Sequence, residues 1–230
     1  MNVIWQGLVE AVKLIIRLDP EVLTVLFLTL RVTGTATLIA LVLGLPIGTY
    51  LALNEFPGRQ PIVALINTGM GLPPVVVGLF VFLFLARSGP FGSFEVLYTP
   101  TAMIIAEIII ATPMVMGVTV AAIQALDPRL QLQIMSLGAN RWQFFWTLVK
   151  EARLSLLAAV AAGFGAIISE VGAVMMVGGN IKGETRVLTT AIVLATRQGQ
   201  VSLAIALSII LLGLTFFVNI FITKAQQGKR

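Results

Sequence analysis

Few side chains in this sequence could take part in catalysis. The chain contains no histidine and no cysteine, which excludes imidazole general bases, Ser-His-Asp triads, disulfides and Cys/His metal sites. Two glutamates, Glu107 and Glu170, lie inside long apolar segments, where a carboxylate is costly and therefore a candidate functional group. A function must come from helix packing, carboxylates, amides and hydroxyls, so we predict no catalytic residue and no metal site.

One glycine-rich stretch resembles a phosphate-binding loop but lacks the lysine that the motif requires. Residues 178–185 read Gly-Gly-Asn-Ile-Lys-Gly-Glu-Thr. Glu184 stands where the motif requires lysine, and a carboxylate there would repel a phosphate. We therefore predict that the chain has no nucleotide site and binds no cofactor. If the protein moves a solute uphill, the energy must come from an ion gradient or from another subunit.

The composition predicts that these residues belong to a membrane protein. Hydrophobic residues make up 58% of the 230 and charged residues 11%, whereas charged residues make up about 25% of a typical globular domain. A helical crossing takes about 20 apolar residues, so the chain can hold about five. The net charge is +5, and the lysine and arginine residues that produce it are spread over the loops. This distribution is typical of basic residues that set the orientation of a membrane protein, and it does not indicate binding of nucleic acid.

The apolar segments predict an all-α fold with five transmembrane helices. Residues 1–20 form an amphipathic segment expected in the membrane interface, residues 21–223 a single transmembrane domain, and residues 224–230 a tail. The expected spans are 22–53, 61–86, 101–123, 154–177 and 201–223. A further segment, 187–196, is too short to cross and is expected to be interfacial or re-entrant.

The distribution of lysine and arginine predicts the orientation of these spans. Basic residues are more frequent on the side of the membrane that holds residues 124–153 and the C-terminus. Because cytoplasmic loops are enriched in basic residues, we expect this side to be cytoplasmic and the N-terminus to lie outside a plasma (inner) membrane.

The longest polar break, residues 124–153, is predicted to hold two short helices. Gly138 can end the first, and Asn140 followed three residues later by Gln143 is typical of a cap that starts the second. The second helix would carry aromatic side chains at helical spacing, namely Trp142, Phe145 and Trp146. Such side chains either dock into a partner's groove or pack beneath the membrane bundle, and the pattern leaves both possibilities open.

This break also resembles the cytoplasmic coupling loop of ABC importer permeases. Residues 136–146, Ser-Leu-Gly-Ala-Asn-Arg-Trp-Gln-Phe-Phe-Trp, resemble the second half of a motif in which Glu-Ala-Ala is followed after three residues by Gly. Leu132, Gln133 and Ile134 occupy the Glu-Ala-Ala positions, and Lys150-Glu151 replaces the usual downstream Leu-Pro. The resemblance implies ATPase contact through Ser136, Leu137, Gly138, Ala139, Asn140, Arg141 and Trp142.

Two further regions resemble the branch of these permeases that imports molybdate, tungstate and sulfate. The first is Leu-Pro-Pro-Val-Val-Val-Gly at 72–78, followed by Ser-Gly-Pro-Phe-Gly at 88–92. The second begins with Ile-Ser-Glu-Val-Gly-Ala at 168–173 and continues through 176–181 and 188–192. The Ser-Glu-Val-Gly run and the degenerate coupling motif most resemble tungstate permeases.

The resemblance implies an assembly with several partners. It predicts a homodimer of this chain, two cytoplasmic ATPases that bind ATP and Mg²⁺, and an extracytoplasmic protein that delivers the oxyanion. The residues expected at the translocation path or its gate are Pro73, Pro74, Glu107, Ser169, Glu170, Asn180 and Thr189.

Each of these path residues also has a structural explanation. The two glutamates could pair with Arg31 or accept hydrogen bonds that hold helices together. The two prolines could form a tolerated kink, and the polar residues near the outer mouth could simply be hydrated.

Two other functions fit the sequence. An ion-coupled secondary transporter could carry protons on Glu107 or Glu170, in which case no ATPase should co-purify. A membrane scaffold that transports nothing could use the 124–153 break only for packing, in which case transport should survive loss of the chain.

Overall fold

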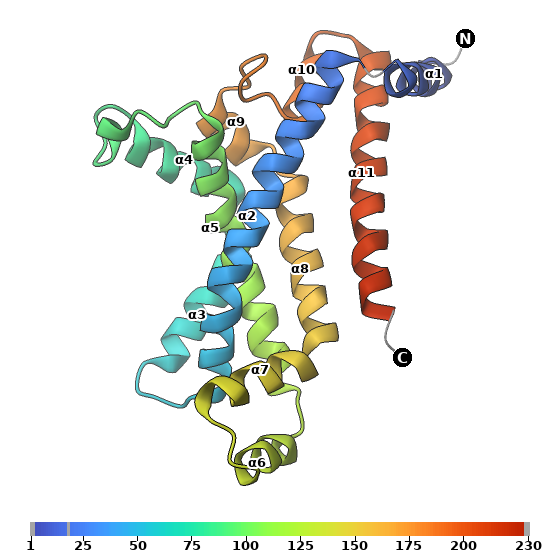
Figure 1. Cartoon of the computed structure of the whole chain (residues 1–230). Helices are drawn as coiled ribbons and strands as arrows, with labels where there is room; N and C mark the ends of the chain where they lie inside the picture. Colours follow the sequence, from blue (N-terminus) through green and yellow to red (C-terminus); the bar gives the residue numbers. More distant parts are fainter. Residues whose placement is uncertain (1–2, 18, 228–230) are drawn as a thin grey trace.

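All regular secondary structure in the described part of the chain is helical (Figure 1). The computed structural model describes residues 3–17 and 19–227. Two long helices, α2 (Pro20–Leu53) and α5 (Pro100–Gln124), pack along each other at the centre. Their close approach requires glycine, because a Cβ on Gly44 of α2 would lie 2.7 Å from Val115 Cγ1 of α5. The predicted all-α fold is confirmed.

The expected span 61–86 consists of two helices. α3 (Arg59–Met70) and α4 (Pro74–Leu85) differ in direction by 102°, and α4 projects sideways from the bundle (Figure 1, left). Pro73 is extended, with φ −61° and ψ 121°, and Pro74 begins α4. A proline has no N–H to donate and moves the preceding residue out of the helical region. The sequence predicted a kink at these two prolines, and the structure shows it as a sharp break between two helices.

The expected span 154–177 is also divided. α8 (Arg153–Ile168) ends before Ser169, and α9 (Gly172–Gly178) begins after a short break. Glu170 consequently lies between two helices, where the sequence predicted it inside one. After α9 the chain forms a loop that leads to α10 (Leu188–Arg197), which has 10 residues and is as short as expected.

The first and last helices contact each other at the edge of the molecule. α1 (Val3–Ile16) crosses one end of α11 (Val201–Gln227) (Figure 1). Gly7 of α1 lies directly against the Ile205 side chain of α11, so a larger residue at this position would collide with it. The other short elements are a 3₁₀ helix, η1 (Gly92–Phe94), and the pair α6 (Pro128–Ser136) and α7 (Arg141–Glu151).

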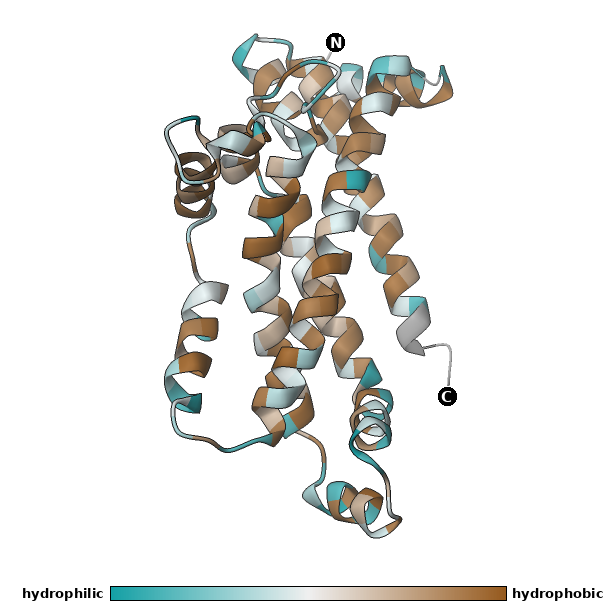
Figure 2. Cartoon of the chain, turned by 60° about the vertical axis from the view of Figure 1, so that its left-hand side comes forward, coloured by the Kyte–Doolittle hydropathy of each residue, from teal (hydrophilic) through white to brown (hydrophobic). Residues whose placement is uncertain are grey.

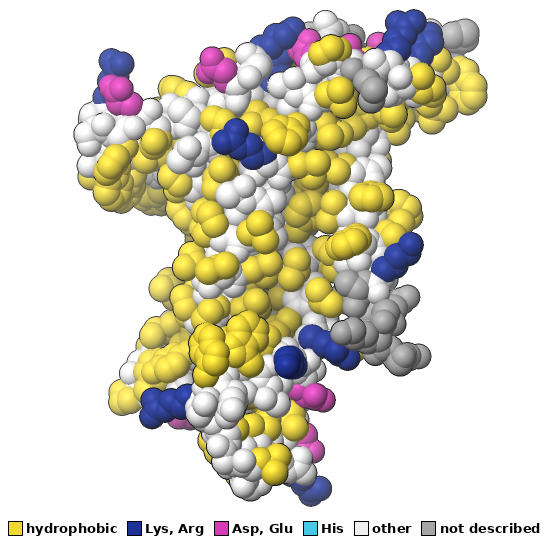
Figure 3. All heavy atoms as spheres, in the orientation of Figure 1, with side chains coloured by type: hydrophobic (Ala, Val, Ile, Leu, Met, Phe, Trp, Pro, Cys, Tyr) yellow, Lys and Arg dark blue, Asp and Glu magenta, His cyan; other side chains and the backbone are white. Residues whose placement is uncertain are grey.

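Length and composition agree with a polytopic membrane protein. Among the described helices, α2, α5 and α11 are long and apolar enough to cross a membrane, and the bent pairs α3–α4 and α7–α8 raise the number to five if each is one span. Hydrophobic residues dominate the middle of the long helices (Figure 2). Charged side chains gather mostly towards the two ends (Figure 3).

Candidate coupling hairpin and translocation region

The polar break folds into the predicted pair of helices, which lies at the end of the bundle opposite α1 and α10 (Figure 1). Gly138, with φ +75°, separates α6 from α7. At the start of α7 the Gln143 N–H donates to Asn140 Oδ1 (2.8 Å), and the Asn140 N–H donates to Gln143 Oε1 (2.9 Å). These reciprocal bonds form a capping box, so the predicted turn and cap are confirmed. We call α6, the turn and α7 the coupling hairpin.

The structure brings the seven predicted coupling residues together at the tip of this hairpin. Ser136 ends α6, where its hydroxyl donates to the Gln133 carbonyl (2.8 Å). Arg141 and Trp142 open α7. Leu137 is 86% exposed, although a leucine side chain is usually removed from water in a folded protein. An exposed apolar tip is typical of a surface that binds another protein.

Two residues of α6 that the sequence analysis did not select extend this apolar surface. Leu132 and Met135 are exposed beside Leu137. Their three-residue spacing places them on the same side of a helix, and this spacing was the signal that could have identified them. On α7, Trp142 stacks on Phe145 at a ring distance of 6.0 Å, and both rings meet Trp146 edge to face.

The opposite face of the coupling hairpin packs under the bundle. Ile134 of α6 and Leu148 of α7 are buried in a cluster with Ile123 of α5 and Leu156 of α8. Of the two possibilities that the sequence left open, packing is confirmed for this face of the hairpin, and docking stays a prediction for the other. One face anchors it to the spanning helices, and the other is exposed.

The break between α8 and α9 is held by two hydrogen bonds to Glu170. Its carboxylate atom Oε1 accepts from the Ala173 N–H (2.9 Å) and thereby caps the start of α9. Its backbone carbonyl accepts from the Thr189 hydroxyl of α10 (2.9 Å). Two of the predicted path residues, Glu170 and Thr189, thus meet here and tie three helices together.

The two prolines lie at the start of the helix that packs against this break. A Cβ on Gly78 of α4 would lie 2.6 Å from Ala173 Cα, and one on Gly172 would lie 2.6 Å from Val75 Cγ2. The backbone of α4 is therefore almost in contact with that of α9. We call Glu170, Ala173, Thr189 and the adjoining first half of α4 the helix-break region.

Two further path residues, Ser169 and Asn180, do not join Glu170 in its hydrogen bonds. The Ser169 hydroxyl is exposed and donates to the Gly165 carbonyl of its own helix (3.1 Å). Asn180 lies beyond the far end of α9, with φ +53°, and its side chain accepts from Arg186 Nε (3.3 Å).

The loop that contains Asn180 is organised by Thr185, the last residue of the glycine-rich stretch. The Thr185 hydroxyl is fully buried, donates to the Gly178 carbonyl (2.6 Å) and accepts from the Ile181 N–H (2.9 Å). The glycines around it indicated a turn, and a threonine in such a stretch is a common source of side-chain bonds to the backbone.

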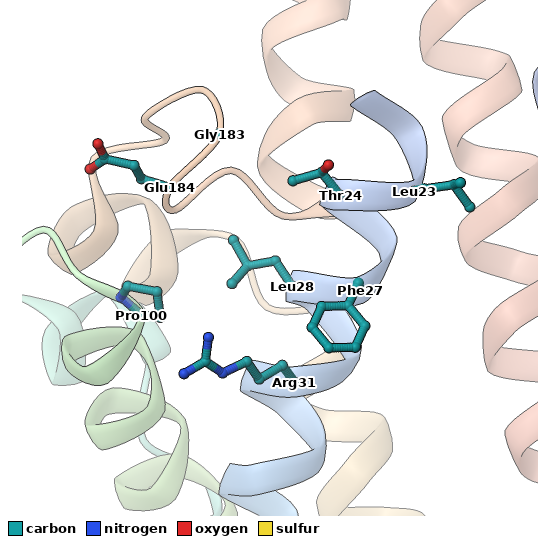
Figure 4. Close-up of a pocket in the computed structure, with 8 residues that line it drawn as sticks. All are labelled: Leu23, Thr24, Phe27, Leu28, Arg31, Pro100, Gly183 and Glu184. Atoms are coloured by element: carbon teal, nitrogen blue, oxygen red, sulfur yellow. The ribbon is translucent and has the colours of Figure 1, made fainter. Parts of the chain in front are cut away.

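Glu107 lies inside the bundle, and the suggested pairing with Arg31 is absent. The glutamate is 3% exposed, its carboxyl group lies beside the Thr33 hydroxyl, and Glu170 is near enough to interact with it electrostatically. Within the described residues its Oε2 atom has no hydrogen-bond partner. Arg31 instead lines a surface pocket (Figure 4). Thr33 and Arg31 are two residues apart on one helix and so face roughly opposite directions.

In the residues that the structure describes, no group of three or more acidic, histidine or cysteine side chains could hold a metal ion.

Comparison with known proteins identifies the family. Residues 44–230 match the family described as the inner membrane component of binding-protein-dependent transport systems. The chain belongs to this family. Its members work with separate ATPases and binding proteins, and this chain is a multi-pass membrane permease subunit of an ABC importer.

Relatives and a solved structure support this assignment. A tungstate uptake system permease protein of Peptoclostridium acidaminophilum is 37% identical over 99% of this chain and 100% of its own length. A probable anion ABC transporter permease of Haloferax volcanii is 41% identical over 83% of this chain and 84% of its own. The structure of a bacterial ABC transporter for the polysaccharide alginate has the same fold, with a TM-score of 0.70, 20% identity, and coverage of 90% of this chain and 79% of that chain.

Proposed function

We propose that this permease carries tungstate into the cell and that two cytoplasmic ATPases, which bind ATP and Mg²⁺, drive it through the coupling hairpin. The observation that carries the proposal is the apolar tip at Leu137, which is exposed at one end of the bundle while the opposite face of the hairpin is anchored to the spanning helices. A rigid element with one buried face and one exposed apolar face is suited to transmit motion from a docked protein.

Tungstate is favoured over other solutes by two lines of support. The relative from Peptoclostridium acidaminophilum, which aligns with 99% of the chain, is named for tungstate uptake, and the Ser-Glu-Val-Gly run resembles tungstate permeases. The interior glutamates would repel an oxyanion, so we assign them to the framework around the path. We assign high-affinity binding to an extracytoplasmic protein, because a solute held tightly by the path would not leave it.

The path itself is proposed to form between two copies of the chain related by a twofold axis. Few spans are available in one copy to enclose a gated route, and a symmetric pair doubles them. The gate is assigned to the helix-break region and to Pro73 and Pro74. Discontinuous helices at membrane depth are tolerated where they are buried in protein or line a water-filled cavity.

The orientation follows from this assignment. Because the ATPases are cytoplasmic, the coupling hairpin faces the cytoplasm, and α1, α10 and the 179–187 loop at the opposite end lie outside. The C-terminus would then lie on the cytoplasmic side, as the distribution of basic residues predicts. Ion-coupled transport on Glu107 or Glu170 is not favoured, because the chain belongs to an ABC importer family.

Replacing one exposed side chain tests the coupling assignment. We expect Leu137→Glu to reduce ATPase co-purification and tungstate uptake by at least about tenfold, because the loss of an apolar interface anchor commonly costs 2 kcal/mol or more. The thermal unfolding midpoint should not change, since the side chain is almost fully exposed. The measurements are pull-down of the ATPases and uptake into proteoliposomes that contain the permease, its ATPases and the binding protein.

A second exposed apolar residue provides the matched control. Phe94 of η1 is 67% exposed at the opposite end, and Phe94→Glu should leave ATPase co-purification unchanged. Equal retention of ATPase by both variants would show that the coupling hairpin is not the docking site. The substrate is tested in the same vesicles with tungstate-, molybdate- and sulfate-loaded binding protein, and faster uptake of molybdate or sulfate than of tungstate would overturn that part of the proposal.

A further inference from the structure

An arginine within a membrane-spanning helix lines a surface pocket and has no charged partner in the structure. Arg31 of α2 forms no ion pair and no hydrogen bond within the described residues. The pocket has a volume of about 440 Å³ and lies between α2, the start of α5 and the 179–187 loop (Figure 4). Its lining residues are Leu23, Thr24, Phe27, Leu28, Pro100, Gly183 and Glu184, together with Arg31.

The charge distribution around this pocket favours an anion. In Figure 4 the guanidinium group of Arg31 points towards Pro100, the first residue of α5. No side chain caps this helix start, because the Thr99 hydroxyl donates instead to the Val96 carbonyl (2.6 Å). A helix N-terminus carries partial positive charge, so a cation and a positive helix end face each other. An anion between them would remove this repulsion.

One acidic residue also borders the pocket and has to be accounted for. Glu184 lies in the 179–187 loop, and its carboxylate points away from Arg31 in Figure 4. Among the described residues it forms no ion pair with Arg31. Glu184 would therefore weaken the attraction of the pocket for an anion without neutralising it.

The depth of Arg31 in the membrane identifies the kind of anion. α2 has 34 residues and is about 51 Å long, whereas the hydrocarbon core of a bilayer is about 30 Å thick. If α2 is centred, the Arg31 Cα, about 16 Å from the helix start, lies about 6 Å inside the hydrocarbon edge. A long arginine side chain reaches from this depth to the phosphate layer.

The walls of the pocket fit the rest of a lipid molecule. Leu23 and Phe27 are exposed on the surface of α2, and Leu28 is buried behind them. An apolar wall next to a guanidinium suits a phosphate group joined to acyl chains, whereas a free inorganic oxyanion would gain nothing from it. Arginine also binds phosphate oxygens with two parallel hydrogen bonds.

We propose that this pocket binds the phosphate of a phospholipid from the leaflet at the α1 and α10 end, with Arg31 as its principal contact. The site is distinct from the coupling hairpin and from the helix-break region. Its occupant would fill the space between α2, α5 and the 179–187 loop and thereby hold the loop against the spanning helices.

Lipid retention by the purified full-length chain tests this proposal. Delipidated protein in detergent is titrated with dioleoyl phosphatidylglycerol, with diolein as the lipid lacking phosphate, and with sodium tungstate as the free oxyanion. Native mass spectrometry measures the bound lipid, and the thermal unfolding midpoint measures any stabilisation. We expect phosphatidylglycerol to bind and stabilise, and Arg31→Gln to weaken its binding about fivefold to tenfold.

Other variants make the result specific. Arg197→Gln, which removes an exposed arginine of α10 outside the pocket, should bind lipid like the wild type, and Arg31→Lys should retain part of the affinity. If Arg31→Gln does not fold, Glu184→Gln at the exposed rim should bind phosphatidylglycerol more tightly than the wild type. Arg31-dependent stabilisation by tungstate alone, equal binding of diolein, or lipid binding that no substitution at Arg31 or Glu184 changes would each overturn the proposal.

Discussion

The coupling hairpin and the helix-break region are held together by different kinds of contact. Hydrogen bonds in the described hairpin join residues at most five positions apart, as in the cap formed by Asn140 and Gln143. The helix-break region has one local bond, from the Ala173 N–H to the Glu170 carboxylate, but it also depends on bonds between distant segments. The Thr189 hydroxyl donates to the Glu170 carbonyl, and next to it the Leu188 N–H donates to the Thr29 hydroxyl of α2 (3.0 Å). The shape of the hairpin therefore depends on local bonds, whereas the helix-break region depends on contacts among several helices.

The largest effect is expected where two backbones touch. Gly78→Val should destabilise the chain by about 3 kcal/mol, because its side chain would collide with the Ala173 backbone. Gly138→Val in the hairpin meets nothing within 4 Å and should cost only about 1–2 kcal/mol, from the left-handed backbone at φ +75°. Thermal unfolding of the purified chain measures both. A larger loss for Gly138→Val would contradict the contrast between the two regions.

An intermediate effect is expected from the hydroxyl that joins α10 to the break. Thr189→Val should cost about 1–2 kcal/mol, because it leaves the Glu170 carbonyl without this donor, and it should slow tungstate uptake while ATPase binding persists. Thr147→Val is the matched control, since the Thr147 hydroxyl bonds only to the Gln143 carbonyl of its own helix and is exposed. Equal loss of uptake in both variants would remove the proposed role of the break in gating.

The smallest effect is expected from removing the cap of α7. Asn140→Ala should cost about 1 kcal/mol, and the loss should be confined to the coupling hairpin. Hydrogen exchange should accelerate in the first turn of α7, while the amides of α9 and α10 keep their protection. Asn140→Ser, which can still cap, should restore most of the protection in α7. Faster exchange in α9 would mean that the two regions are not independent.

Features that depend on neighbouring residues were predictable from the sequence. The lengths of α2 and α5 follow from their apolar runs, and the turn between α6 and α7 follows from Gly138, Asn140 and Gln143. The length of the apolar run predicted a single helix at residues 154–177. That prediction was wrong, because the hydrophobic run continues through the break between α8 and α9. That break depends on Thr189 and on the close approach of α4, neither of which is visible in the local pattern.

Of the two structural explanations for the intramembrane glutamates, accepted hydrogen bonds are seen at Glu170, and the pairing of Glu107 with Arg31 fails for a geometric reason. Opposite charge suggested that Arg31 and Glu107 form a pair, but charge alone does not tell which face of a helix a residue occupies. Thr33, which lies beside Glu107, is two positions from Arg31 and therefore about 200° around the helix. The periodicity of α2 places its buried threonines, Thr29, Thr33 and Thr37, on a different face from the exposed Arg31. The roles of the predicted path residues stay predictions.

The contact between α1 and α11 limits the order in which the protein can be assembled. Gly7 can pack against Ile205 only after α11 has been synthesised, and α11 is the last of the described helices in the sequence. Before that, α1 would lie on the membrane surface, where amphipathic helices are stable. Final docking of the first helix on the last would thus be a late event in biogenesis.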